Sequence, residues 1–325
     1  MVLFLTEREV RGLLGMQDAM QAVEEVLREQ GRGEATNQPR QRVSVDGVTL
    51  HVLPAAVPGA GSMGLKAYIT RPGGGRFWVL LLGTDGALRA IIEADLLGQV
   101  RTGAATGVAT RHLSRLDSRE VGIIGSGYQA RTQLEAVCAV RSIEHVRAWS
   151  PTRENLLRFC DEMTSRLSVP MEPMADARSA VQGADIVVTM TKAREPVLLG
   201  DWLEPGVHVN AAGSNQAANR EVDARAFSRA DLIAVDDLAQ SRVESGDLIA
   251  AVKEGTIRWE AITELGSVIA GDKPGREEPE DITLFESHGI GIWDIALASR
   301  VYDTAVRQGL GTELPIEAGP GPATP

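Results

Sequence analysis

The chain has 325 residues, of which 43% are hydrophobic and 24% charged, and its formal net charge is −11. This composition is typical of a globular protein with about two domains. The acidic balance argues against nucleic acid as a partner, because phosphate binding requires a basic surface. The two cysteines and five histidines lack metal-ligand spacing, so we expect no metal site and no disulfide.

Membrane and export signals are not evident in the sequence. No stretch approaches the ~20 apolar residues that a membrane span needs. The apolar start at residues 1–5 is too short for a signal peptide, and charged residues follow at once. We therefore expect a cytoplasmic protein without a membrane partner.

The N-terminal part combines one helical pattern with several strand patterns. Thr6-Glu7-Arg8-Glu9 has the form of a capping box, and apolar residues recur at helical spacing over 16–29. Asp46-Gly47 and Asp85-Gly86 are turn signals between apolar runs, which predicts hairpins. The predicted strands cover 42–45, 48–53, 63–69, 77–82 and 87–92, and a helix follows at 96–116.

The pattern changes after residue 116. Short apolar strands now alternate with helices, which predicts an α/β fold with a parallel, doubly wound sheet over 117–288. The predicted strands are 121–124, 145–149, 184–190, 207–212 and 232–236, with helices up to 140 and over 153–167.

The last amphipathic helix, at 291–308, follows the end of the parallel pattern. Such a helix often returns to the first domain. We therefore predict a discontinuous α+β domain made of 1–116 and 289–317. The tail at 318–325 is rich in Pro and Gly, which favours disorder.

A glycine turn lies between the first predicted parallel strand and its helix. Gly125-Ser126-Gly127-Tyr128-Gln129-Ala130 matches the GxGxxA form of a Rossmann dinucleotide-binding turn. Gly125 permits the tight turn, Gly127 permits close approach of a pyrophosphate, and Ala130 keeps helix and strand close. The helix N-terminus then faces the phosphates. This context predicts an NAD(P) site.

The end of the next strand bears on the choice between NAD and NADP. An NAD site usually carries an acid there, which accepts a hydrogen bond from the ribose 2′-hydroxyl. Here Ser150, Thr152 and Arg153 precede the first acid, Glu154. Hydroxyls and a guanidinium suit a 2′-phosphate, so the sequence favours NADP(H) over NAD(H).

Three cationic residues outside the glycine-turn domain are candidates for a substrate site. Lys66 lies inside an otherwise apolar strand, where an unpaired charge would be costly. Arg42 opens a strand and Arg101 lies near the start of a helix, and arginine suits bidentate carboxylate recognition. Each of them is also compatible with an ordinary surface charge.

Taken together, the motifs resemble the ornithine cyclodeaminase/mu-crystallin family in order and spacing over nearly the whole chain. The resemblance implies a central Rossmann domain, a substrate and dimerisation domain, and a homodimer. Family members include cyclodeaminases, an archaeal type of alanine dehydrogenase and cyclic ketimine reductases. The motifs are Arg42, Gly64-Leu65-Lys66, Arg101-Thr102-Gly103-Ala104-Ala105, the 125–130 turn, residues 208–215 and residues 285–290.

The resemblance also implies a role for individual residues. Arg42 and Arg101 correspond to the grip on the substrate carboxylate, and Lys66 to the lysine that moves a proton. His288 corresponds to a loop beside the nicotinamide, where it would contact substrate or merely pack. Cofactor contacts are implied for Thr102, Thr189, Thr191, Gly213 and Ser214.

Asn215 is the main departure from the cyclodeaminase pattern, which has Asp at this position. Asparagine cannot exchange a proton near neutral pH, so it would only orient a substrate amine or a water. Reduction of a preformed imine needs one hydride and one proton, and Lys66 can supply the proton. Arg42 and Arg101 are expected to lower the pKa of Lys66. The pocket near Tyr68, Phe77 and Trp78 is expected to select the substrate side chain.

Three functions remain open at this stage. We favour an NAD(P)-dependent oxidoreductase of small α-imino or α-amino acids, either an imine reductase or an enzyme like alanine dehydrogenase. The first alternative is a cyclodeaminase that releases ammonia from ornithine or lysine and recycles NAD. The second is a protein of mu-crystallin type that binds NADPH and a small ligand.

Overall fold

The computed structural model describes residues 2–316, so the tail predicted at 318–325 lies outside the described residues. The chain forms two compact units, one made of 2–101 with 290–316 and the other of Thr102–Gly289. No helix among the described residues is long and apolar enough to cross a membrane. Both the helix-bearing antiparallel unit and the parallel, doubly wound sheet are present, so the predicted fold class is confirmed.

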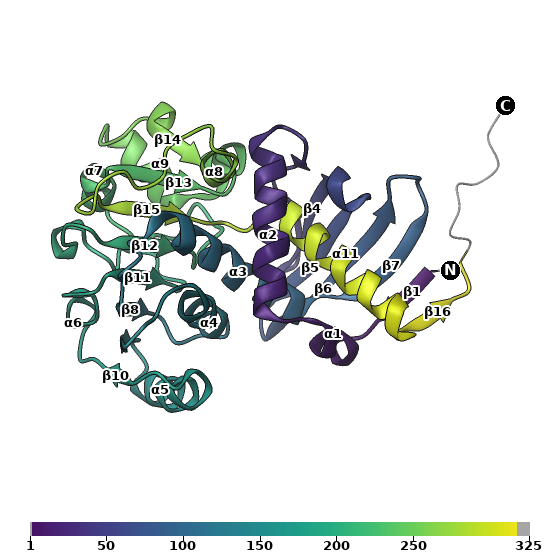
Figure 1. The fold of residues 1–325 in the computed structure, drawn as a ribbon, viewed down its shortest axis with the longest axis horizontal. Coiled ribbons are helices and arrows are strands. Elements are labelled where there is room, and N and C mark those ends of the chain that lie inside the picture. Colours follow the sequence, from purple (N-terminus) through teal and green to yellow (C-terminus); the bar gives the residue numbers. More distant parts are fainter. Residues whose placement is uncertain (1, 317–325) are drawn as a thin grey trace. The chain divides into compact units, whose positions relative to one another are not determined.

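The first unit is built on a mainly antiparallel sheet (Figure 1). Its strands follow the order β16-β1-β7-β6-β5-β4-β2, and β3 also pairs with β4. The strands are β1 (Val2–Leu5), β2 (Thr36–Asn37), β3 (Gln41–Val45), β4 (Val48–Val57), β5 (Ser62–Arg71), β6 (Gly74–Gly83), β7 (Leu88–Glu93) and β16 (Thr312–Leu314). The helices are α1 (Glu7–Leu13), α2 (Met16–Gly31), the 3₁₀ turn η1 (Pro58–Ala60), the start of α3 (Asp95–Leu113) and α11 (Gly291–Gln308).

One face of this sheet carries the core of the unit. Helix α11 packs on β4, β5 and β6, and α2 packs against α11 (Figure 1). Alternate residues point to the helices and are buried, while the residues between them face the other way. The buried set includes Leu53, Ala55, Val79, Leu81, Ala90 and Ile92. The last helix therefore belongs to the same unit as the N-terminal strands.

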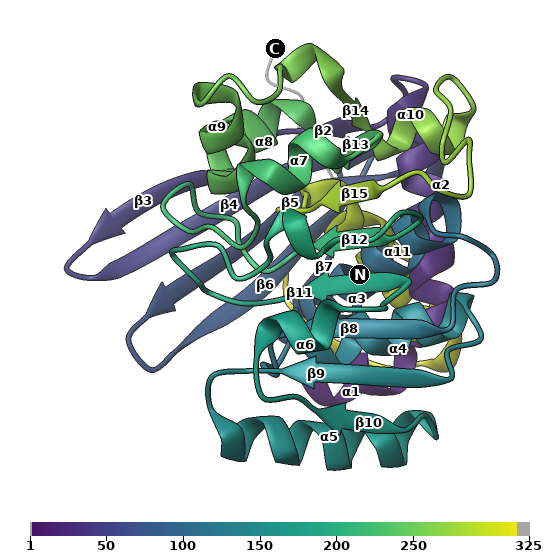
Figure 2. The same ribbon diagram turned by 90° about the vertical axis from the view of Figure 1, so that its left-hand side faces the viewer.

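The second unit contains a sheet of eight described strands, all paired in parallel (Figure 2). Their order is β10-β9-β8-β11-β12-β15-β13-β14. The strands are β8 (Glu120–Ile124), β9 (His145–Trp149), β10 (Met171–Pro173), β11 (Ile186–Thr189), β12 (His208–Ala211), β13 (Leu232–Val235), β14 (Ile262–Glu264) and β15 (Thr283–Glu286). The helices are α4 (Ala130–Val140), α5 (Arg153–Leu167), α6 (Ala177–Val181), α7 (Ala224–Arg229), α8 (Leu238–Glu244), α9 (Gly246–Lys253) and α10 (Leu265–Ala270), with 3₁₀ turns η2 (Gly200–Trp202) and η3 (Trp259–Ala261).

Each face of the parallel sheet has its own apolar core. Ile123 and Val188 lie in the cluster that includes α4 and α5, whereas Ile124 and Val187 lie in the cluster that includes α6, α7 and α9. Neighbouring residues of one strand thus serve opposite faces. This explains why these strands are short continuous apolar runs in the sequence.

The boundary between the units lies within α3, at Arg101 and Thr102, rather than at residue 116 as expected. The second half of α3 packs closely against α4. A Cβ at Gly103 of α3 would lie only 2.3 Å from the carbonyl oxygen of Thr132 in α4. Thr106 also donates a hydrogen bond to Gln133 at 2.5 Å. One continuous helix can supply both units, which its sequence periodicity does not reveal.

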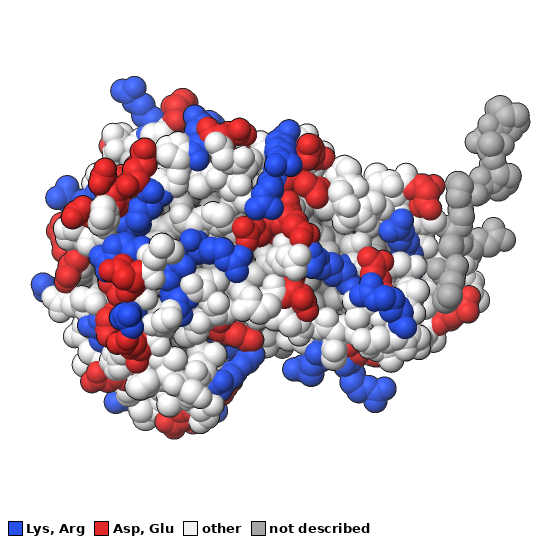
Figure 3. Space-filling model, in the orientation of Figure 1, with Lys and Arg blue, Asp and Glu red and all other residues white. Residues whose placement is uncertain are grey.

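The surface charges are mixed. On the face drawn in Figure 3, basic and acidic side chains of the described residues lie interspersed.

Several strands that the sequence pattern does not predict are very short, namely β1, β2, β10, β14, β15 and β16. Strands of two to four residues carry too little alternation to be recognised from pattern alone.

Candidate functional site

The glycine turn of the second unit has the geometry that close ligand approach requires. Gly125 follows β8 with a φ of 117°, and a Cβ there would lie 2.2 Å from the Met190 carbonyl oxygen. A Cβ at Gly127 would meet nothing within 4 Å. Helix α4 begins at Ala130, so its free amides lie at this turn. Strand packing therefore requires the first glycine, and the open space lies at the second.

A buried carboxylate joins the loops that follow β11 and β12. Glu221 accepts hydrogen bonds from the Thr191 amide at 2.6 Å and the Gly213 amide at 2.7 Å. Burial raises the pKa of Glu221, although these hydrogen bonds oppose the increase. Thr189, at the end of β11, is fully buried. The predicted residues Thr191 and Gly213 are thus neighbours at the carboxyl edge of the sheet, beside the glycine turn.

The loop after β15 lies against the loop after β12. His288 donates a hydrogen bond through Nδ1 to the Ser214 carbonyl oxygen at 3.0 Å, since a carbonyl can only accept. Asp236 accepts from the backbone amides of His288 and Gly289, each at 2.8 Å. The His288 side chain is 2% exposed and lies 3.7 Å from Glu286. Asn215 directly follows Ser214, so His288 helps to position the loop that carries it.

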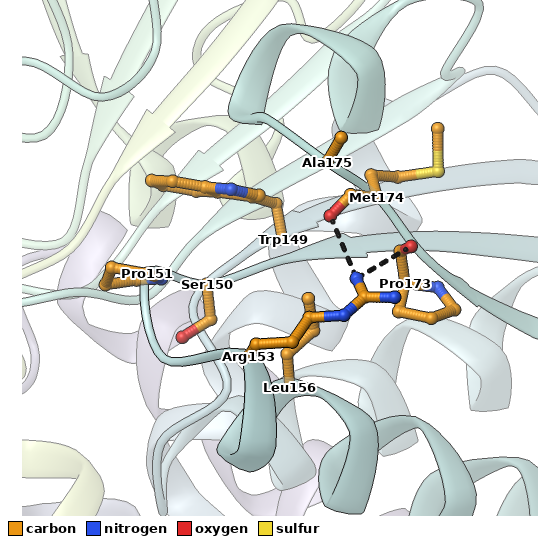
Figure 4. A pocket seen from close by; sticks show the side chains of 8 residues that line it. All are labelled: Trp149, Ser150, Pro151, Arg153, Leu156, Pro173, Met174 and Ala175. Carbon is orange, nitrogen blue, oxygen red and sulfur yellow. Dashed lines mark hydrogen bonds between the residues drawn. The ribbon is translucent and has the colours of Figure 1, made fainter.

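A pocket of about 620 Å³ opens beyond the end of β9 (Figure 4). The Arg153 guanidinium donates to the carbonyl oxygens of Pro173 at 3.3 Å and Met174 at 3.5 Å. Ser150 and Arg153 line the pocket, whereas Thr152 does not and instead is the N-terminal cap residue of α5. The lining residues are Trp149, Ser150, Pro151, Arg153, Leu156, Pro173, Met174 and Ala175.

In the first unit, Lys66 lies in a buried ion-pair cluster. Its Nζ donates to Asp294 Oδ1 at 2.9 Å, and Arg101 Nε donates to the same oxygen at 3.1 Å. The side chains of Lys66 and Asp294 are 4% and 0% exposed. Arg101 Nη1 and Asp294 Oδ2 have no hydrogen-bond partner among the described residues. The cluster therefore retains a buried donor and a buried acceptor for a polar ligand.

The pKa of Lys66 reflects its burial more than its charged neighbours. Burial lowers this pKa to about 8, Asp294 raises it, and Arg101 and Arg40 lower it further. The expected contribution of Arg42 is not among these causes. Arg42 is exposed on β3, whereas Arg40 is buried, so Arg40 replaces Arg42 in this role. Burial also raises the pKa of Asp294, but Arg101 and Lys66 bring it below the ordinary value.

A row of rings lies on the same face of the sheet as Lys66. His51 stacks on Tyr68 with ring centroids 4.2 Å apart, and Tyr68 stacks on Phe77 at 5.1 Å. Burial lowers the pKa of His51 to about 4, with Arg42 and Arg40 adding to the effect, so His51 is neutral near pH 7. Trp78 pairs with Ala67 and therefore lies on the opposite face, so its expected place in the pocket was wrong.

The predicted residues are divided between the two units. The first unit holds Arg42, Lys66 and Arg101. The second holds the glycine turn, residues 150–153, Thr102, Thr189, Thr191, Gly213, Ser214, Asn215 and His288.

Three residues of the site are not predicted by the sequence patterns, namely Arg40, Glu221 and Asp294. Asp294 had a recognisable signal, because it is an acid within the apolar run Gly291-Ile292-Trp293-Asp294-Ile295. Glu221 had none, since it lies in an irregular segment.

The chain matches the model of the ornithine cyclodeaminase/mu-crystallin family over residues 2–309. It is 34% identical to an alanine dehydrogenase of Archaeoglobus fulgidus over 320 residues, which is 96% of this chain and 98% of the relative. The chain therefore belongs to the ornithine cyclodeaminase/mu-crystallin family, as its motifs predicted.

Solved structures agree with this assignment. A Δ1-pyrroline-2-carboxylate reductase of Thermococcus litoralis, in complex with NADH and L-proline, superimposes with a TM-score of 0.92 at 34% identity, over 96% of this chain and 100% of that one. An archaeal alanine dehydrogenase dimer with bound NAD gives a TM-score of 0.91 at 34% identity, over 96% and 98%.

The lowered pKa of Lys66 predicts a specific dependence of stability on pH. Between pH 8 and 10.5 the unfolded chain holds a proton on Lys66 that the folded chain has lost, so the free energy of unfolding rises with pH. Lys66→Met should lack this rise, which amounts to about 3 kcal/mol across the window. Urea unfolding at several pH values measures it. Lys253→Met, at an exposed lysine of α9, is the control, and parallel curves for wild type and Lys66→Met would contradict the prediction.

Proposed function

We propose that this chain is an NAD(P)-dependent oxidoreductase that interconverts small α-imino acids and α-amino acids. The observation that carries the proposal is the buried Lys66–Asp294–Arg101 cluster, in a family whose relatives include an alanine dehydrogenase and an imine reductase. Arginine supplies a donor for a carboxylate, and a lysine of lowered pKa exchanges a proton near neutral pH.

The residues divide the reaction between them. Arg101 and Arg42 hold the substrate carboxylate, and Lys66 gives a proton to the imine nitrogen during reduction or removes one during oxidation. Asn215 orients that nitrogen, and His288 contacts the substrate or holds the Asn215 loop. A bound, reduced nicotinamide would supply the hydride that the reduction of the substrate α-carbon requires. Tyr68 and Phe77 border the side chain of the substrate.

The second unit has the features that a dinucleotide needs. The space at Gly127 admits a pyrophosphate, and the amides at the start of α4 donate to it. We assign further cofactor contacts to residues around this edge of the sheet. They are Thr102, Gly125, Ser126, Tyr128, Gln129, Ala130, Thr189, Thr191, Gly213 and Ser214.

Asn215 favours this function over cyclodeamination. An amide cannot exchange a proton near neutral pH, whereas cyclodeamination requires several proton transfers. The same residues suit oxidation of alanine, provided that Lys66 serves as the base for addition and loss of water or ammonia. We also propose that the protein is cytoplasmic.

The direct test follows absorbance at 340 nm with NADPH or NADH and a panel of imines. The panel contains pyruvate with ammonia, pyruvate with methylamine, pyrroline-2-carboxylate, piperideine-2-carboxylate and iminosuccinate. We expect the wild-type protein to oxidise the reduced cofactor with at least one of these imines. Arg101→Met should lower kcat/KM by about 100-fold or more, because the variant loses a charged hydrogen bond to the substrate carboxylate. Arg111→Met, in the last turn of α3, is the control. A flat trace throughout would refute the oxidoreductase, and ammonia release from ornithine without added cofactor would then indicate a cyclodeaminase.

We also propose that NADP(H) is preferred over NAD(H). The pocket beyond β9 is lined by Ser150 and Arg153, and the first acid, Glu154, is not among its lining residues. Thr152 adds a hydroxyl next to the pocket. The structures of relatives contain NADH or NAD, so the preference of this chain requires its own measurement.

Arg153→Ala should raise the KM for NADPH by about tenfold and leave that for NADH nearly unchanged, because only the 2′-phosphate requires the guanidinium. Steady-state kinetics with both cofactors measure the two constants. Arg158→Ala, an exposed arginine of the same helix, should change neither. An equal effect on both cofactors would remove the support for NADP(H).

A homodimer is the third part of the proposal. The face of the first sheet opposite α11 carries exposed apolar side chains, including Val43 at 68%, Val45 at 67% and Leu50 at 40% exposure. The strand register places all three, with Met63, on this one face. Exposed apolar side chains gathered on one sheet face, as Val43, Val45 and Leu50 are on the paired strands β3 and β4, are typical of an interface, and a second copy is the occupant that fits a symmetric sheet pairing.

The double substitution Val43→Glu with Val45→Glu should convert a dimer into a monomer, because four carboxylates would face each other across the axis. Sedimentation velocity measures the change. Val243→Glu, at a 60% exposed valine of α8, should leave the mass unchanged. A wild-type protein that sediments as a monomer would refute the dimer.

A further inference from the structure

Asp294 provides the anionic partner of Lys66 in the described chain. It lies on α11, which packs on the sheet although it is distant from β5 in the sequence. Its Oδ1 accepts hydrogen bonds from both Lys66 Nζ and Arg101 Nε. The carboxyl group is fully buried. A buried carboxylate shared by two cations fixes the position of both side chains.

The other groups around Lys66 are cationic or uncharged. Arg101 on α3 and Arg40 before β3 oppose a charge on the lysine. The Tyr68 and Phe77 rings lie 5.8 and 5.7 Å from Nζ. Without Asp294, a buried ammonium would face two guanidinium groups in a medium that already disfavours its charge.

The backbone also leaves Lys66 little freedom to move. A Cβ at Gly98 would lie 2.7 Å from Lys66 Nζ, so α3 approaches the amine directly. Helix α11 packs closely on the strand that carries Lys66, since a Cβ at Gly64 would lie 3.1 Å from Ile295. The amine thus lies against α3 and donates to Asp294 of α11.

We propose that Asp294 is the positioning residue that keeps Lys66 charged and aimed for proton transfer, with Arg101 held by the same oxygen to receive the substrate carboxylate. This rests on the proposed imine reductase function. In the reduction, the imine α-carbon accepts a hydride from the reduced nicotinamide. The imine nitrogen accepts a proton from Lys66 Nζ, and Lys66 regains its proton from water. In this step Asp294 acts through Lys66 and Arg101, the two side chains that its Oδ1 holds.

The test is the pH dependence of kcat/KM for imine reduction in Asp294→Asn. The proposed reduction requires protonated Lys66, so the wild-type kcat/KM should fall as pH rises through about 8. Removing the carboxylate should lower the pKa of Lys66. The basic limb of the kcat/KM profile should therefore move to lower pH by about one to two units. The rate loss should therefore be about tenfold or more at pH 8 and much smaller at pH 6. A uniform loss at all pH values would show a merely structural role and overturn the proposal.

Asp303→Asn is the matched control, because it makes the same change at an exposed position of α11 and should leave the profile unmoved. If Asp294→Asn does not fold, Asp294→Glu retains the charge but displaces it by one methylene. The limb should then stay near its wild-type position while kcat falls, and a wild-type kcat would overturn the proposal. Failure of the proposed function is distinguishable, since wild type itself would then reduce no imine.

Discussion

The ion pairs of Asp294 determine what the first unit is able to do. Two cations lie in its interior, and isolated buried charges would destabilise the fold. A single carboxylate oxygen compensates both and holds them side by side. The remaining polar atoms, Arg101 Nη1 and Asp294 Oδ2, are buried without a partner among the described residues. Unpaired buried polar atoms destabilise the folded unit, and a polar ligand that forms hydrogen bonds with them would remove this destabilisation.

In the second unit, close backbone packing at Gly125 and hydrogen bonds to the Glu221 carboxylate hold the loops at the carboxyl edge of the sheet in place. Gly125 lies so close to the backbone at Met190 that no side chain fits there, and Glu221 joins the loops after β11 and β12. His288 and Asp236 tie the loop after β15 to the same region. Loops from adjacent parallel strands therefore meet at one edge, where dinucleotides bind in sheets of this topology.

These two arrangements suit different parts of one reaction. The first unit offers charge complementarity to a small carboxylate and a lysine whose pKa lies near 8. The second offers a phosphate-binding helix terminus and a pocket beyond β9 with a guanidinium at its side. In the function proposed here, specificity for the acid belongs to the first unit and specificity for the cofactor to the second.

The amino-acid sequence by itself determined the parallel sheet, the glycine turn, the hairpins and the family. These features depend on local periodicity, turn residues and short motifs, each of which is complete within a few tens of residues. Lys66 was also recognisable, because a charge inside an apolar strand requires a partner. The tertiary structure alone decided that the partner is Asp294, 228 positions along the chain. It likewise decided that Arg40 rather than Arg42 acts on Lys66, that Trp78 faces away, and that α3 divides between the units. Such facts depend on which distant elements pack together, and strand pairing and helix docking fix this only when the whole core assembles.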